Sequence, residues 1–176
     1  MSRLAGLGVL VLLWLAAVAA AAAPGAVVAC GPQDLRAAFR VVAGSAGAGS
    51  NSYTVRLSNR GARACSVSGR PGLRLLGRHG ARLPTAVVAD RPGTGAAALI
   101  RVAPGATAIA LARLSPDIPG KGEPVRGRCE PTAFRLRVSL ASPGSGAVTG
   151  PVRPPTPVCQ RGRIVEGLLH LARRAG

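Results

Sequence analysis

The sequence predicts an all-β fold, an immunoglobulin-like antiparallel β-sandwich of seven to nine short strands. Two observations support this prediction. Beyond residue 29, several short segments alternate apolar and polar residues with a period of two, whereas no long segment repeats its apolar residues every 3.6 positions. Residues that favour turns separate these segments at short intervals, as in sandwiches built from many short strands. A β-barrel is the alternative closure for the same strands.

Three segments carry the clearest alternation. In each, the apolar side chains are expected to face the core and the polar side chains to face water. The inward-facing residues are Leu35, Ala37, Phe39 and Val41; Tyr53, Val55 and Leu57; and Phe134, Leu136, Val138 and Leu140. The positions between them place five arginines on solvated strand faces: Arg36, Arg40, Arg56, Arg135 and Arg137. Tyr53 would then need a hydrogen-bond partner for its hydroxyl near the sheet edge.

The stretches between these segments predict the remaining elements. Glycine, proline and asparagine clusters mark turns, and short apolar runs between them mark strands. The predicted turns and loops are 44–52, 59–61, 70–72, 77–80, 103–106, the long loop 115–128 and the irregular stretch 143–157. The further predicted strands are 73–76, 99–102, 107–114 and a last strand at 163–169. Binding surfaces usually lie on such long loops.

Residues 1–29 are predicted to be a secretory signal peptide. Arg3 precedes an apolar run and an alanine-rich stretch, which offers small residues for cleavage. Residues 30–172 are then expected to form a single β-sandwich domain, and residues 173–176 a basic tail. The protein is accordingly expected to be secreted or to lie in the cell envelope.

Two alternatives attach the protein to a membrane. An uncleaved leader would be a transmembrane anchor, but its strongly apolar run is shorter than the roughly 20 residues of a spanning helix. The segment Val27-Val28-Ala29-Cys30 resembles a loose bacterial lipobox, in which Cys30 would carry the lipid. Lipidation of Cys30 would leave an odd number of cysteines, which in an exported chain needs its own explanation.

Four widely spaced cysteines are predicted to form two disulfides: Cys30, Cys65, Cys129 and Cys159. Four cysteines allow three connectivities, and the sequence does not choose strictly between them. We favour Cys30–Cys65 and Cys129–Cys159, because each pair links segments that the strand pattern brings together. No metal site is predicted, since no two cysteines have a zinc-type spacing and the two histidines stand alone.

The formal net charge of +17 invites comparison with nucleic-acid-binding proteins. The arginines are, however, spread along the chain, and no aromatic residues are interleaved with them as a platform for stacked bases. Lysine is almost absent among the basic residues, a bias that accompanies alanine, glycine and proline in proteins from GC-rich genomes. We expect no specific nucleic-acid partner, but a general attraction to anionic envelope polymers or membrane surfaces.

No catalytic residue, metal or cofactor is predicted. The acidic residues show no paired or metal-ligand spacing, and Pro143-Gly144-Ser145-Gly146 lacks the strand and helix that frame a hydrolase nucleophile. His79 is expected at a solvated hairpin tip and His170 near the end of the last strand. A secreted hydrolase assembled from distant residues remains the third functional alternative.

Several ordered motifs resemble an exported actinobacterial family called domain of unknown function four-two-three-two. They are Cys30-Gly31-Pro32-Gln33-Asp34-Leu35, the segment from Tyr53 to Gly61 that continues into Ala64–Gly72, Val102–Ala108, and Cys129-Glu130-Pro131. The stretch 83–99 and the loop after Ser115 match no part of the family pattern. The resemblance implies an exported or lipid-anchored β-sandwich and no reaction. Together these observations predict an exported, non-catalytic module of unknown ligand, with binding of an anionic envelope polymer as the alternative.

Overall fold

The computed structural model describes residues 27–93, 98–125, 129, 131–140 and 146–173. Most of the predicted leader, the Ser145 motif apart from Gly146, and the last three residues of the predicted tail therefore lie outside the described residues. Within the described part the fold is all-β, as predicted. A search of those residues found no helix long and apolar enough to cross a membrane.

Eleven strands and one short 3-10 turn make up the described fold. The strands are β1 (Leu35–Val41), β2 (Asn51–Asn59), β3 (Cys65–Ser68), β4 (Gly72–Leu76), β5 (Ala86–Ala89), β6 (Leu99–Val102), β7 (Thr107–Leu114), β8 (Thr132–Ser139), β9 (Ala147–Pro157), β10 (Arg163–Glu166) and β11 (His170–Leu171), and the 3-10 turn η1 (Gln160–Gly162) lies between β9 and β10. This is more than the seven to nine strands predicted, because β3, β5, β9 and β11 lie outside the segments that were predicted to be strands.

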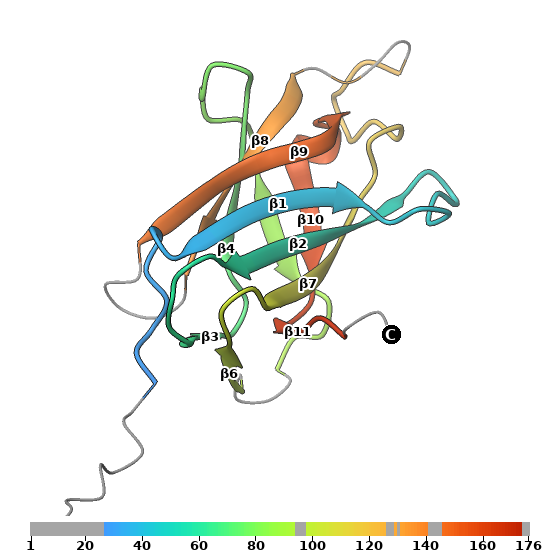
Figure 1. Ribbon diagram of the computed structural model, residues 1–176. Coiled ribbons are helices and arrows are strands. Elements are labelled where there is room, and N and C mark those ends of the chain that lie inside the picture. Colours follow the sequence, from blue (N-terminus) through green and yellow to red (C-terminus); the bar gives the residue numbers. More distant parts are fainter. Residues whose placement is uncertain (1–26, 94–97, 126–128, 130, 141–145, 174–176) are drawn as a thin grey trace, which may run out of the picture.

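The main sheet has nine strands in the order β4-β8-β9-β1-β2-β7-β10-β5, with β11 beside β7. It curls so far that it nearly forms a barrel: β9, β1, β2 and β7 make the front wall in Figure 1, and β4 and β10 lie behind it. The connection from β4 to β5 narrows the remaining gap, because the Leu83 N–H donates to the Leu75 carbonyl. A separate pair, β3–β6, lies at the lower end in Figure 1.

The predicted antiparallel, immunoglobulin-like sandwich is not confirmed. Two neighbouring pairs are parallel, β1 with β9 and β5 with β10, so the sheet is mixed. These pairs join strands that are far apart in the sequence. Period-two alternation reports only which face of a strand is buried, and it contains no information about such partners.

The alternation did predict the inward faces of β1 and β2. Phe39 and Tyr53 are fully buried, and their rings stack with centroids 4.6 Å apart. The Tyr53 hydroxyl is 2.9 Å from the Thr156 Oγ1 on β9, which supplies the partner that a buried tyrosine requires. Beside Tyr53 on the neighbouring strand β7, the interior face carries the small side chains of Ala108, Ala110 and Ala112, followed by Leu114 at the end of the strand. The alanines leave room for the stacked rings.

Both favoured disulfides are present. Cys30–Cys65 fastens the start of the domain to β3, and Cys129–Cys159 fastens the end of the loop after β7 to the turn that precedes β10. The two bridges indicate folding in an oxidising environment. They also close loops at both ends of an aromatic-poor core, which restricts the unfolded chain.

Three local predictions were wrong. Residues 147–157, expected to be irregular because of their prolines, form the longest strand, β9; Pro154 and Pro155 lie where its pairing with β8 is interrupted, whereas Pro151 and Pro157 are paired with Arg135 and Thr132. Phe134 is only half-buried, since a register shift between Ala133 and Arg135 turns Ala133 inward instead. The strand β10 stops at Glu166, and residues 167–169, which have no regular secondary structure, separate it from β11.

Candidate functional site

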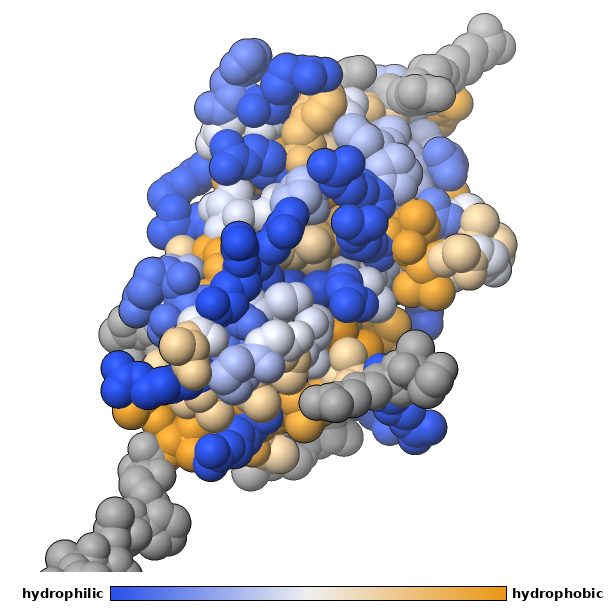
Figure 2. Space-filling view, in the orientation of Figure 1, coloured by the Kyte–Doolittle hydropathy of each residue, from blue (hydrophilic) through white to orange (hydrophobic). Residues whose placement is uncertain are grey.

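Four arginines from three adjacent strands gather on the outer surface of the front wall. Arg36 and Arg40 come from β1, Arg56 from β2 and Arg153 from β9, and together they line one hollow of about 240 Å³. We call these four residues the arginine face. Figure 2 shows strongly hydrophilic side chains concentrated over this part of the molecule.

The strand registers explain why these residues meet. Arg40 pairs directly with Arg153 across the parallel β1–β9 ladder. Arg56 pairs with Ala38, so it lies diagonally between Arg36 and Arg40 on the neighbouring strand. Diagonal neighbours in a ladder are about 7–8 Å apart, and direct neighbours about 5 Å. The backbone of the sheet thus fixes the origins of four long cationic side chains within a short distance of one another.

No carboxylate balances this charge within the described part of the chain. The one ion pair found there joins Arg70 to Asp90, whose side chains are 3.2 Å apart. The polar groups that accompany the arginines are hydroxyls: Ser58 Oγ and Thr107 Oγ1 lie 2.8 Å apart beside the Arg36 end of the face. The arginine face is therefore a concentration of positive charge with hydrogen-bond donors but without acidic groups.

A second hollow adjoins the first at Arg56. It has a volume of about 660 Å³ and lies between the β6–β7 turn and the chain after β11. Arg101 of β6 and Arg173 contribute further exposed guanidinium groups to it, while Pro104, Gly105 and Leu171 form part of its floor and walls. Arg56 lines both hollows, so the positive surface continues from one into the other.

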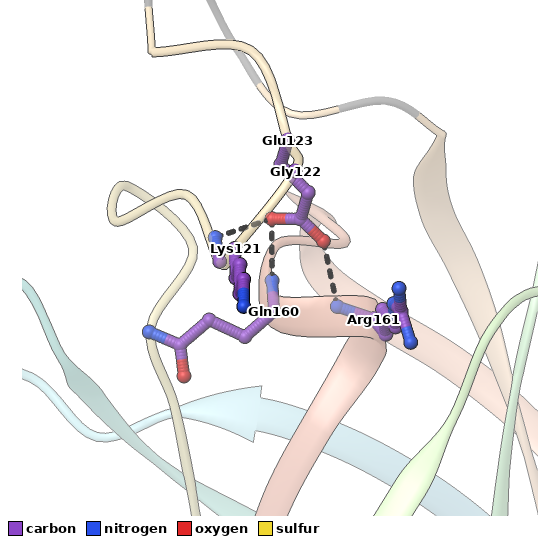
Figure 3. Close-up of a pocket in the computed structure, with 6 residues that line it drawn as sticks. Lys121, Gly122, Glu123, Gln160 and Arg161 are labelled. Atoms are coloured by element: carbon purple, nitrogen blue, oxygen red, sulfur yellow. Dashed lines mark hydrogen bonds between the residues drawn. The ribbon is translucent and has the colours of Figure 1, made fainter.

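A third hollow, about 720 Å³, lies elsewhere, where the loop after β7 meets η1. At its centre the Glu123 carboxylate accepts hydrogen bonds from the backbone N–H groups of Gly120, Gln160 and Arg161, each at 2.7 Å (Figure 3). These bonds hold the pKa of Glu123 below its ordinary value. The positive φ angles of Gln160 and Arg161 turn both N–H groups toward the same carboxylate. Glu123 therefore fastens the long loop to η1.

The same carboxylate belongs to a three-residue group with ligand-type atoms, Glu123, Cys129 and Cys159, all within 4.8 Å of one another. Both sulfur atoms are joined to each other in a disulfide. Because metal binding by cysteine requires a thiolate, this oxidised group does not provide a metal site. Its arrangement is explained by the loop attachment described above.

A buried carboxyl group is the second unusual feature. Glu166, at the end of β10, is fully buried, and neither of its carboxyl oxygens has a hydrogen-bond partner. Burial raises the pKa of Glu166 to about 8, against a smaller opposing effect of Arg70 and together with a small contribution of Asp90. Arg70 reaches this end of β10 from outside: its Nε donates to the Glu166 carbonyl and its guanidinium binds Asp90.

The two histidines lie in different parts of the fold, and both are exposed. His79 is exposed in the turn after β4, as expected for a hairpin tip. His170 is exposed on β11, where it lines a hollow of about 500 Å³ together with Arg70 and Asp90. That hollow contains an ion pair whose partners already satisfy one another.

Sequence reasoning placed Arg36, Arg40 and Arg56 on solvated faces, which is correct, but treated the arginines as scattered. The structure brings them together with Arg153 because β9 lies beside β1. The only sequence signal for the cluster was the recurrence of arginine at outward positions of two predicted strands. The sequence signal for Glu166 is its phase in the last predicted strand, where it shares the inward face with Ile164.

Comparisons with known proteins give one finding. No curated protein and no solved structure matches the chain. A family profile does match, over residues 30–167, which covers most of the chain and both disulfides. This protein therefore belongs to the family described as Domain of unknown function (DUF4232).

Proposed function

We propose that this protein is an exported, non-catalytic domain that binds an anionic polymer of the cell envelope through its arginine face. The observation that carries the proposal is the gathering of Arg36, Arg40, Arg56 and Arg153 on one solvent-exposed sheet surface, with no acidic side chain among the described residues that line it. Guanidinium groups present fixed forks of N–H donors that match phosphate, sulfate and carboxylate oxygens. The sheet fixes the backbone positions of the four arginines before the ligand binds, and this preorganisation lowers the entropic cost of binding.

Three features support an extracytoplasmic location. The N-terminal sequence has the order of charge, apolar run and small residues that is typical of a signal peptide. The described fold is cross-linked by two disulfides, which persist mainly in oxidising compartments. The net charge of +17 would attract anionic polymers and lipid headgroups there.

Two of the carboxylates, Glu123 and Asp90, are engaged in structural hydrogen bonds. Glu123 is held by three backbone N–H groups, and Asp90 by Arg70 and the backbone of Arg91. Carboxylates that accept such hydrogen bonds stabilise the loops in which they lie. The groups that remain available on the arginine face are hydrogen-bond donors with fixed positive charge, and these recognise anions without transferring protons.

The proposal is tested by titrating the mature, disulfide-bonded protein with long-chain polyphosphate over a range of salt concentrations. Binding is expected to weaken steeply with salt, because each neutralised charge releases a counterion. The test variant carries Arg36→Gln, Arg40→Gln and Arg56→Gln. We expect it to lose at least about tenfold in affinity and to reduce the log–log salt slope by about 2–3.

A matched control removes the same charge from other surfaces. Arg74→Gln, Arg82→Gln and Arg163→Gln change exposed arginines on β4, the β4–β5 connection and β10, none of which lines the hollow of the arginine face. The control variant is expected to lose less than about threefold in affinity. Equal losses in both variants would show that net charge alone attracts the polymer, and the proposal would be wrong.

A further inference from the structure

The two hollows that meet at Arg56 have a combined shape that a small anion does not fill. The hollow of the arginine face occupies about 240 Å³ and the hollow beside the β6–β7 turn about 660 Å³, and Arg56 is the residue that lines both. Arg40 and Arg153 lie at one end of this surface, and Arg101 and Arg173 at the other.

The spacing of the charges suits an extended ligand. Arg36 and Arg40 are four residues apart on β1, a separation of about 13 Å at the rise of an extended strand. Arg56 lies diagonally between them, about 7–8 Å from each. On the other side of Arg56, Ile109 of β7 is its register partner, and His170 of β11 is the register partner of Ile109. Arg173 follows three residues after His170 and lines the adjoining hollow. Cationic groups therefore follow one another in steps along the surface and do not surround one point.

The lack of aromatic side chains among the described residues of the two hollows restricts the kind of ligand that they can bind. Phe39 and Tyr53 are buried against each other, and Phe134 lies under the guanidinium group of Arg78, 4.1 Å from its ring centroid. Of the described residues that line the two hollows, none is aromatic. Without a stacking platform the surface has no means of holding bases. Guanidinium forks and the nearby hydroxyls of Ser58 and Thr107 instead match the oxygens of tetrahedral phosphate groups.

We infer that the two hollows form one groove, which binds a single extended chain of phosphate groups from Arg153 and Arg40, past Arg56, to Arg101 and Arg173. This inference rests on the proposed function and specifies its ligand as a linear phosphate polymer. A flat lipid surface would contact the most protruding cations, whereas a flexible chain can follow a hollow that turns from the sheet face to the β6–β7 turn. Charge complementarity along the whole groove then favours longer chains.

Chain length provides the test. The full mature protein is titrated with tripolyphosphate, with long-chain polyphosphate and with phosphatidylglycerol vesicles. We expect the long chain to bind at least about tenfold more tightly than tripolyphosphate, because it contacts arginines in both hollows. The variant with Arg101→Gln and Arg173→Gln is expected to lose about tenfold in affinity for the long chain but to bind tripolyphosphate as before. Arg56→Gln is expected to weaken both ligands.

A double variant with Arg74→Gln and Arg163→Gln removes the same charge outside the groove and serves as the control. If Arg101→Gln with Arg173→Gln affects the long chain no more than this control does, the single groove is wrong. The proposed function survives that result when the arginine-face variant still loses affinity, and it fails when that variant also behaves like the control. Tighter binding to the vesicles than to the long chain would overturn the phosphate chain in favour of a lipid surface.

Discussion

Replacing Glu166 by glutamine should stabilise the protein and remove most of a pH dependence that the buried carboxyl group causes. Glu166 is fully buried on β10, both carboxyl oxygens lack hydrogen-bond partners, and its pKa is raised from 4.5 to about 8. In the unfolded chain the same group ionises near its ordinary value. Between these two pH values the unfolded state has released a proton that the folded state still holds, so the free energy of unfolding falls as pH rises.

The magnitude follows from the two pKa values. No penalty exists below about pH 4, where both states are protonated. Each further pH unit costs about 1.4 kcal/mol, which amounts to about 3 kcal/mol at pH 7 and levels off near 5 kcal/mol above pH 8. Glu166→Gln keeps the shape of the side chain without an ionisable proton. We therefore expect the variant to match the wild type near pH 4 and to unfold about 10 °C higher at pH 7.

Thermal and urea unfolding followed by far-ultraviolet circular dichroism, from pH 4 to pH 9 with the disulfides intact, measures this difference. Asp117→Asn, which removes an exposed carboxyl group from the loop after β7, is the control and should leave the slope with pH unchanged. Arg70 and Asp90 are the charged groups that act on Glu166, so the slope should also respond to Arg70→Gln. A wild-type stability that does not fall between pH 5 and pH 8, or a Glu166→Gln profile parallel to the wild type, would refute the reasoning.

Three further predictions concern the cross-links and the core. Replacing Cys129 and Cys159 together by serine should lower the free energy of unfolding by about 3–4 kcal/mol, measured by urea unfolding, and an unchanged midpoint would contradict the role of the bridge. Tyr53→Phe leaves the Thr156 hydroxyl without its buried partner and should cost about 1–2 kcal/mol in the same assay, whereas a loss below measurement error would mean that the hydrogen bond contributes nothing. Intact-mass measurement of the protein from its own host, with and without reductant, should show a chain that starts near Cys30. Reduction of the two disulfides should add the mass of four hydrogens. An uncleaved leader or four free thiols would contradict export with two disulfides.

The sequence predicted the parts of the fold that depend on local alternation. Tyr53, Val55 and Leu57 face the core as expected, because a one-residue slip would place all of them in water. The strands 99–102 and 107–114 were predicted with their observed bounds, since the Pro-Gly turn between them limits both.

The sequence could not predict which strands become neighbours. The parallel contact of β1 with β9 joins segments that lie more than a hundred residues apart, and no local pattern encodes it. The same contact brings Arg153 to Arg40, so the arginine face was missed for the same reason as the sheet order. The strand β9 was missed because prolines argue against a central strand, yet here Pro154 and Pro155 lie where a register shift interrupts the ladder, and Pro151 and Pro157 are accommodated within it.

The disulfide at Cys30 has a consequence for how the protein can be held at a cell surface. One sulfur atom forms either a bridge to Cys65 or a thioether to a diacylglycerol, and it cannot do both. Any lipid-tethered form of this chain would begin with an acylated residue and leave the thiol of Cys65 unpaired beside β6, where Cys65 pairs with Val102. The covalent fate of a single atom thus decides between a doubly bridged domain and a lipid-tethered one that retains a single bridge.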